Sequence, residues 1–119
     1  MIMSKNTDKV LYLAVYKFII YLYQLVRNYP KEYKYSLGED TLKLAWQTLD
    51  YVVETNTKPN SEKQMYIQKA LSSFTRLKFR LRLASECKII SNKSYAHIID
   101  QSEKINKMLK GWLTWSKGI

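Results

Sequence analysis

The chain has 119 residues, a length that suits one domain, or an obligate oligomer of one domain, rather than two separate cores. Hydrophobic residues make up 46% and charged residues 25%, a globular composition that excludes disorder over most of the chain. Three glycines and two prolines are too few for the many turns of an all-β domain, so helices are expected. The single cysteine excludes an intramolecular disulfide and fits a reducing compartment.

Charge is the most functional feature of the composition. Twenty lysines and arginines face ten acidic residues, a formal net charge of +10 at pH 7. A small basic domain usually binds a polyanion, either nucleic acid or an anionic membrane surface.

Residues 10–26 are apolar enough to require a comparison with membrane segments. A spanning helix needs roughly 20 predominantly apolar residues, and this run is shorter and carries Lys17 near its middle. It also lacks a small-residue cleavage site of the kind that ends a signal peptide. We therefore expect a buried helix of a cytoplasmic protein that does not enter a membrane.

The first helix is predicted from a cap at Thr7 and Asp8 to Tyr29, where Pro30 stops it. At about 100° per residue, its core stripe falls on one face. That stripe holds Leu11, Val15, Phe18, Leu22, Leu25, Val26 and Tyr29. A second apolar stripe, well off the first, holds Tyr12, Tyr16, Ile20 and Tyr23. A helix that is apolar on two sides is buried on two sides, within the fold or between subunits.

Residues 30–40 are predicted to form an aromatic-rich connector that packs on the helices. A second helix follows from Gly38 to Glu54. Its expected core positions are Leu42, Ala45, Trp46, Leu49, Val52 and Val53. A polar turn with Pro59 then leads to Ser61, the first residue of the third helix.

The third helix, which ends at Cys87, carries two contrasting faces. The core face holds Ile67, Ala70, Phe74, Leu77, Leu81 and Ala84. On the far side lies a second apolar strip made of Met65, Ser72, Phe79 and Leu83. Basic residues border this strip, with Lys69, Arg76 and Arg80 on one flank and Lys78 and Arg82 on the other.

The fourth helix is predicted from a cap at Ser91 or Asn92 to Ser116. Its core positions are Tyr95, Ile98, Ile99, Ser102, Ile105, Leu109 and Trp112. Four helices with short to moderate links predict an all-α fold, an up-down four-helix bundle that spans residues 1–119 as one domain.

The sequence shows no catalytic pattern. His97 lacks the second imidazole or carboxylate set that a metal or a general base would need, so a surface histidine is expected. Cys87 has no neighbouring histidine and is expected to be a buried, inert thiol. Gly38 and Gly111 are isolated and form no phosphate-binding loop. We expect a protein without catalytic activity, metal or cofactor.

The basic residues of the third and fourth helices are the candidate nucleic-acid-binding residues. Three of the four arginines lie between positions 76 and 82, and arginine binds phosphate through its planar fork. The alternative is a solvated helix face with no ligand. No base-reading motif is present, so the expected contacts are to phosphates. The candidates are Lys69, Arg76, Lys78, Arg80, Arg82, Lys107 and Lys110.

The two outer apolar strips predict self-association. Together they would expose an uncommonly large apolar patch on a small monomer. A closed homo-oligomeric ring covers that patch and gathers positive charge on one surface. The predicted interface residues are Tyr12, Tyr16, Ile20, Phe79 and Leu83.

Four segments resemble a known family. Residues 29–38 are similar to the connector between the first two helices of the accessory variability determinant (Avd) proteins of diversity-generating retroelements. Residues 77–84 resemble the basic helix of that family, residues 90–95 its turn between the third and fourth helices, and residues 105–112 its Gly-Trp ending. The wider four-helix-bundle family includes proteins encoded by intervening sequences in ribosomal RNA genes.

The resemblance implies a pentameric, barrel-like assembly without catalytic activity. It also implies association with the retroelement reverse transcriptase and with template RNA or cDNA during mutagenic copying. Arg76, Lys78, Arg80 and Arg82 match the basic helix of the family. Two alternatives stay open, namely a structural or protein-interaction module of the ribosomal intervening-sequence type, and a membrane-surface protein that uses the helix at residues 10–26.

Overall fold

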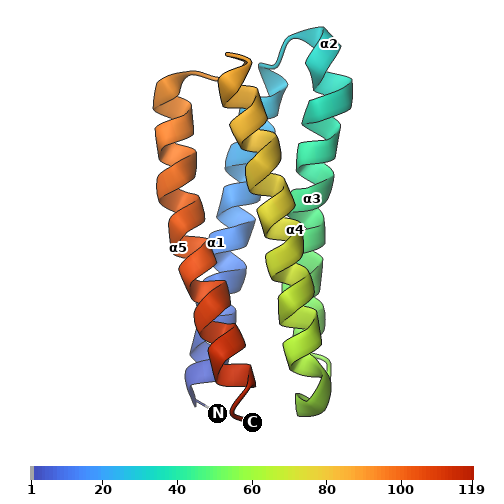
Figure 1. Ribbon diagram of the computed structural model, residues 1–119, viewed down its shortest axis with the longest axis vertical. Helices are drawn as coiled ribbons and strands as arrows, with labels where there is room; N and C mark the ends of the chain where they lie inside the picture. The colour runs from blue at the N-terminus through green and yellow to red at the C-terminus, as the bar shows by residue number, and fades with distance from the viewer. Residues whose placement is uncertain (1) are drawn as a thin grey trace.

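Residues 2–119 form four long helices and two short helical segments, and no strand lies within them. Figure 1 shows the computed structural model, which describes the backbone of these residues and the side chains from Lys9 onward. The long helices are α1 (Ile2–Arg27), α3 (Glu39–Thr55), α4 (Asn60–Glu86) and α5 (Asn92–Ser116). The short segments α2 (Lys31–Tyr33) and the π-helical η1 (Lys34–Gly38) connect α1 to α3.

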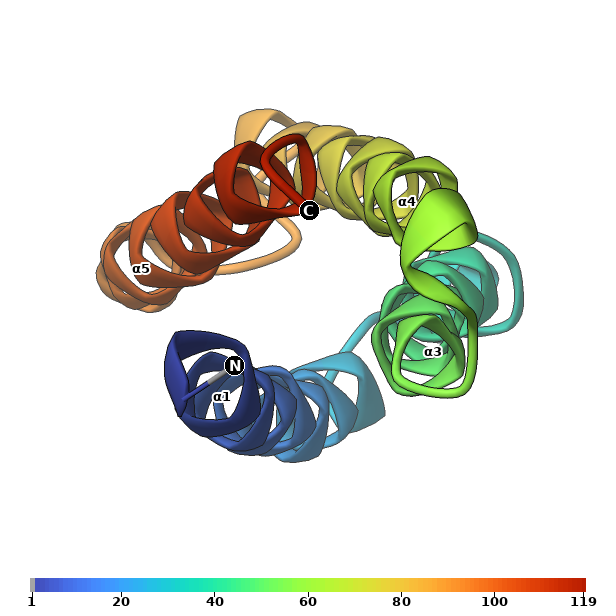
Figure 2. The ribbon, with the colours of Figure 1, turned by 90° about the horizontal axis from the view of Figure 1, so that it is seen from below.

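The long helices run alternately up and down, and both chain ends lie at the same end of the bundle (Figure 1). Viewed along the bundle in Figure 2, α1 packs on α3 and α5, and α4 packs on the same two helices. Helices α1 and α4 therefore lie diagonally opposite each other. The all-α, up-down bundle expected from the sequence is observed, whereas the ring stays a prediction.

The predicted core faces are largely confirmed. In α4 all six predicted core residues are buried. In α1 the predicted stripe is buried except for Leu25, which is half-buried, and Ile19 joins it. In α5 the core positions from Ile98 to Trp112 are buried apart from Ile99, which is exposed, and Tyr95 is half-buried.

The core face of α3 differs from the prediction. Trp46 and Val53 are exposed, and Leu42 is half-buried. Three threonines are fully buried instead: Thr41, Thr48 and Thr55. Because the apolar pattern alone does not include threonine, the predicted face was rotated away from the true one.

These threonines lie seven residues apart on one side of α3, and each satisfies its hydroxyl within the helix. Thr41, Thr48 and Thr55 donate to the carbonyl oxygens four residues earlier, at 2.7, 2.9 and 2.7 Å. The hydrogen bond removes the penalty of burying a free hydroxyl, so each threonine presents its methyl group to the core. A polar residue type thus serves as a core residue.

The connector at residues 30–40 packs on α1 and α3, as predicted, and is itself helical. Pro30 stands just before α2, a position where its missing N–H costs nothing, and η1 continues without a break into α3. Gly38 is buried here, and a Cβ at this position would lie 2.7 Å from Cγ1 of Val26. The absence of a side chain lets the start of α3 approach the end of α1 closely.

Three predictions at helix ends have different outcomes. Ser91 caps α5 as predicted, since its hydroxyl accepts the Ser94 backbone N–H at 3.0 Å. Helix α1 begins at Ile2, before the predicted cap at Thr7 and Asp8, whose side chains lie outside the described residues. The burial predicted for Cys87 is wrong: the thiol is exposed, because Cys87 caps the C-terminus of α4 beyond the last buried residue, Ala84.

Helix α1 combines a buried face with an apolar outer face. Among the described residues, the segment Lys9–Arg27 alone is long and apolar enough to cross a membrane by length and composition, with a mean hydropathy of 1.4. Core helices of soluble bundles meet the same criteria. Here one third of the segment is buried against the other helices, and the expected lack of membrane contact stays a prediction.

Candidate nucleic-acid interface

The outer face of α4 carries the apolar strip expected from the sequence, with basic residues on both of its flanks. Phe79 is 60% exposed, and Met65 and Leu83 are also exposed. One flank faces α3 and the other faces α5, because α4 packs between these two helices. The cations of the two flanks have different surroundings.

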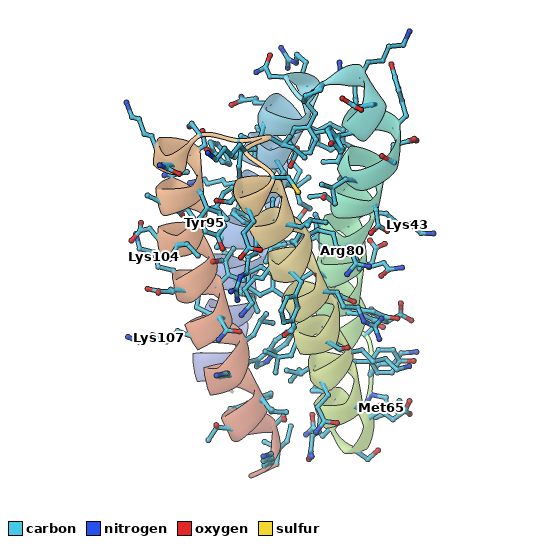
Figure 3. All side chains as sticks on the ribbon, turned by 45° about the horizontal axis from the view of Figure 1, so that its top comes forward. Lys43, Met65, Arg80, Tyr95, Lys104 and Lys107 are labelled. Carbon is cyan, nitrogen blue, oxygen red and sulfur yellow. The ribbon has the colours of Figure 1, made fainter. Side chains whose placement is uncertain are left out.

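On the α3 flank, two of the three cations, Arg80 and Lys69, contact partners within the chain. Arg80 donates from Nε to Oδ2 of Asp40 on α3 at 2.7 Å, and Figure 3 shows Arg80 on this side of α4. The ammonium group of Lys69 lies 4.8 Å from the ring centre of Tyr66 and 5.9 Å from that of Tyr51. An acid and two aromatic rings thus already stabilise these two charges.

On the α5 flank, Lys78 and Lys110 lie close enough to repel each other. Lys78 is half-buried, and its ammonium group lies 5.5 Å from the ring centre of Phe74. Burial, and secondarily the charge of Lys110, lower the pKa of Lys78 below its ordinary value. Neither lysine forms an ion pair in the described part of the chain. Two positive charges without an acidic partner among the described residues therefore meet at the junction of α4 and α5.

A pocket of about 240 Å³ opens beside Lys78. It is lined by Thr75, Lys78, Phe79 and Arg82 of α4 and by Tyr95 of α5. Arg82 donates from Nε to Oε2 of Glu86 at 2.9 Å, and this bond raises the pKa of its guanidinium. Because both side chains are exposed, the pair contributes little to stability and leaves Arg82 available to a ligand. We call the pocket lined by Thr75, Lys78, Phe79, Arg82 and Tyr95 the α4–α5 pocket.

Helix α5 extends the positive surface beyond the α4–α5 pocket. Lys104, Lys107 and Lys110 line a hollow of about 490 Å³ together with Asp100, Glu103 and Asn106. Figure 3 shows Lys104 and Lys107 on the side of α5 that faces away from α4. Lys104 pairs with Asp100 at 3.4 Å. Lys110 thus borders both the hollow and Lys78, and Lys107 lies farther from the junction.

The seven predicted binding residues therefore do not form one site. Lys78, Arg82 and Lys110 gather where α4 meets α5, with Lys107 beside them on α5. Lys69 and Arg80 belong to the α3 flank and have partners there. Arg76 is exposed and forms no ion pair among the described residues.

Two participants escaped the sequence analysis. The spacing of Thr75, one turn before Lys78 and Phe79, could have placed it in the same cluster. Tyr95 was predicted to be a core residue of its helix, and only the packing of α5 on α4 brings it to the pocket. The role of Asp40 as the partner of Arg80, 40 positions later, carried no sequence signal.

The predicted interface residues lie on two separate surfaces. Tyr12 and Tyr16 of α1 stack with ring centres 6.2 Å apart and are exposed, as is Ile20. Trp46 extends this surface onto α3, where its indole N–H donates to the Tyr23 hydroxyl at 3.0 Å. Phe79 and Leu83 lie on α4, diagonally across the bundle. The single chain therefore exposes two different apolar strips on opposite sides.

The residues considered for catalysis have ordinary surroundings. His97 is at the surface, as predicted, with its ring against Tyr21 at 4.7 Å between centres. Over the described residues, no group of three or more histidine, cysteine or acidic side chains could hold a metal ion. The expected lack of catalytic activity, metal and cofactor stays a prediction.

Fold and surface together define a small, basic, all-helical bundle protein whose exposed face combines cations with aromatic rings. The model of the bAvd-like family matches residues 2–115, and the chain belongs to this family. This agrees with the resemblance to Avd proteins in the sequence. A comparison with curated proteins found no significant match.

Proposed function

We propose that this protein is a non-catalytic, nucleic-acid-binding accessory subunit of a diversity-generating retroelement. In this role it associates with the reverse transcriptase and with template RNA or cDNA in the cytoplasm, and it supports mutagenic cDNA synthesis. Membership of the bAvd-like family supports the retroelement setting. The net charge of +10 supports a polyanionic partner.

The observation that carries the proposal is the unneutralised pair Lys78 and Lys110. Like charges that face each other across a helix junction destabilise the bundle, and a bound phosphate reverses that interaction. On the α3 flank, Arg80 needs no phosphate to neutralise its charge, because it already pairs with Asp40. The proposed phosphate-binding surface therefore runs from Arg82 and Lys78 over Lys110 to Lys107.

The mechanism is electrostatic. Each phosphate that a lysine or arginine neutralises releases counterions from the nucleic acid, so the affinity falls steeply as salt rises. The surface reads no bases by hydrogen bonding, since recognition of that kind needs side chains aimed at base edges. The reverse transcriptase supplies the chemistry and the accessory subunit holds the nucleic acid.

The assembly that we propose is a homo-oligomeric ring, a pentamer as in the resemblance to Avd proteins. Tyr12, Tyr16 and Ile20 of one protomer would contact the strip of Phe79 and Leu83 on the next. Because the two strips differ and lie on diagonally opposite helices, their contact is head-to-tail. Head-to-tail contacts generate a ring when the rotation between successive protomers closes, as the proposed pentamer requires.

Size-exclusion chromatography with light scattering tests this proposal on the purified chain, with and without a structured RNA. We expect a mass near five protomers that takes up RNA at low salt and releases it at high salt. Tyr16→Lys, which places a charge in the α1 strip, should lower the mass. A monomer that does not take up RNA at low salt would contradict both the ring and the nucleic-acid-binding role.

A protein-interaction module is the second candidate function, and a pocket of about 340 Å³ between α1 and α3 favours it. The pocket is lined by Tyr23, Val26, Arg27, Lys34, Tyr35, Glu39 and Leu42. Its mostly apolar wall and two cations suit an acidic, apolar peptide. A stable complex with an acidic protein, together with no retention on RNA, would favour this function over the first.

A further inference from the structure

We propose that the α4–α5 pocket binds one unpaired nucleotide, with its base against Phe79 and Tyr95 and its phosphate at Lys78 and Arg82. This inference rests on the proposed nucleic-acid-binding function and adds the class of ligand, a single-stranded nucleic acid. A duplex offers the same phosphates but keeps the faces of its bases covered, so it cannot fill this pocket.

Sequence spacing and helix packing together build the pocket. Thr75, Lys78, Phe79 and Arg82 are spaced as i, i+3, i+4 and i+7, so they share one side of α4. Tyr95 comes from α5, which packs on this side of α4, and adds a second aromatic ring. A volume of about 240 Å³ with two rings and two cations suits a flat aromatic group that carries a negative charge.

Phe79 lacks the apolar surroundings that would make it a core residue. It is 60% exposed, whereas Phe74, five residues earlier on the same helix, is fully buried. Tyr95 is half-buried and packs against the edge of the core. Rings beside cations form the usual platform for unpaired bases, because every base has a face that stacks and a phosphate nearby. In the α4–α5 pocket, the rings of Phe79 and Tyr95 would stack on the base, and Lys78 and Arg82 would bind the phosphate.

Phe79 also belongs to the strip that we propose as a subunit interface. Four residues of helix rotate by about 400°, so Phe79 lies about 40° closer to α5 than Leu83 does. A contact centred on Leu83 and Met65 leaves Phe79 at its edge, beside the α4–α5 pocket. Tyr95 lies outside the predicted interface, so a variant at Tyr95 tests the nucleotide without changing that interface.

The test compares two labelled strands of equal length, an oligothymidylate and the same strand with abasic sites in place of its bases. Both carry the same phosphates, so a difference in affinity reports contacts to bases. Fluorescence anisotropy at low salt with the full-length protein should show about tenfold tighter binding of the strand with bases. Phe79→Ala and Tyr95→Leu should each reduce this preference toward equality, and Lys78→Ala should weaken both strands alike.

Val53→Ala is the matched control, because Val53 is an exposed apolar residue of α3 that belongs neither to the α4–α5 pocket nor to the proposed subunit interface. It should leave the preference unchanged. Circular dichroism checks that each variant folds, and Phe79, an exposed residue, keeps the test decisive if Tyr95→Leu does not fold. Equal binding of the two strands by the unmodified protein would overturn the inference while leaving the proposed function intact. No binding of either strand would contradict the proposed function itself.

Discussion

The two flanks of α4 carry the same kinds of cation in different surroundings. Toward α3, Arg80 pairs with Asp40 and Lys69 lies over tyrosine rings. Toward α5, Lys78 meets the like charge of Lys110. The pair of Arg80 and Asp40 stabilises the bundle, whereas the repulsion between Lys78 and Lys110 weakens it.

This contrast separates cations that act in the fold from cations that are available to a ligand. The less exposed Arg80, which Asp40 already holds, gains little more from a phosphate, whereas the pair of Arg82 with Glu86 is fully accessible to solvent and opens easily. A charge with a basic neighbour gains from neutralisation by any anion. Three predictions below test this difference, starting with the largest expected effect, and a fourth, at Tyr29, gives a reference for the stability measurements.

Removing the two lysines of the α5 flank should have the largest effect on nucleic-acid binding. We expect Lys78→Ala combined with Lys110→Ala to weaken binding about tenfold per lost phosphate contact at low salt. The slope of log K against log salt should fall by about 0.7 for each contact to a single strand. Anisotropy titrations over a range of salt measure both quantities.

The matched control removes Lys17 and Lys43, which are exposed on α1 and α3, with the same loss of charge. Figure 3 shows Lys43 on α3, away from the α4–α5 junction. The control should change affinity far less. An equal loss in both double variants would mean that total charge, not the α5 flank, determines binding.

Breaking the ion pair of the α3 flank should affect stability more than binding. Arg80→Ala is expected to lower the free energy of unfolding by about 1 kcal/mol, since both partners are partly exposed. Urea unfolding of Arg80→Ala, Asp40→Ala and the double variant gives the coupling energy of the pair. Loss of RNA affinity as large as for Lys78→Ala would contradict the distinction between the two flanks.

Tyr29 lies outside both flanks of α4, and a variant at this position gives a reference for the stability measurements. Its buried hydroxyl has no hydrogen-bond partner in the described chain, and burial raises its pKa to about 12. Tyr29→Phe should therefore raise the free energy of unfolding by about 1 kcal/mol, measured by urea unfolding at pH 7.

The pH dependence gives a second readout of Tyr29. Because the folded pKa lies above the ordinary value of 10.0, the stability of the unmodified protein should fall as pH rises from 10.0 to about 12. Tyr29→Phe should lack this contribution. An unchanged alkaline transition in the variant would show that another group is responsible.

Replacing Lys78 alone should have the smallest effect on stability, and its sign should be opposite to that of Arg80→Ala. Lys78→Met removes a half-buried charge beside Lys110, so we expect the free energy of unfolding to rise by less than about 1 kcal/mol. The gain should be present below the lowered pKa of Lys78 and disappear above 10.5, because the lysine is then neutral in both states. A clear loss of stability at pH 7 would mean that Lys78 acts mainly in the fold.

The sequence predicted the elements and most of the core because helical periodicity reports burial directly. All six predicted core residues of α4 are buried. It failed in α3, where the buried threonines satisfy their hydroxyls through main-chain carbonyls and an apolar pattern does not count them. It also failed in the connector, where a π-helical turn and the close approach of Gly38 to Val26 depend on contacts between helices.

The candidate site was predicted only in part, for the same reason. The basic residues of α4 were visible as a cluster, yet their spacing could not separate Arg80 from Lys78. That separation depends on Asp40, Lys110 and Tyr95, which approach α4 from other helices.

The sequence by itself determined that this protein is basic, helical and apolar on two sides, because composition and periodicity belong to each segment alone. The tertiary structure decided which cations are neutralised, which are left unpaired and which aromatic rings lie beside them. Electrostatic interaction depends on distance in space, and the distances between helices exist only once the bundle has formed.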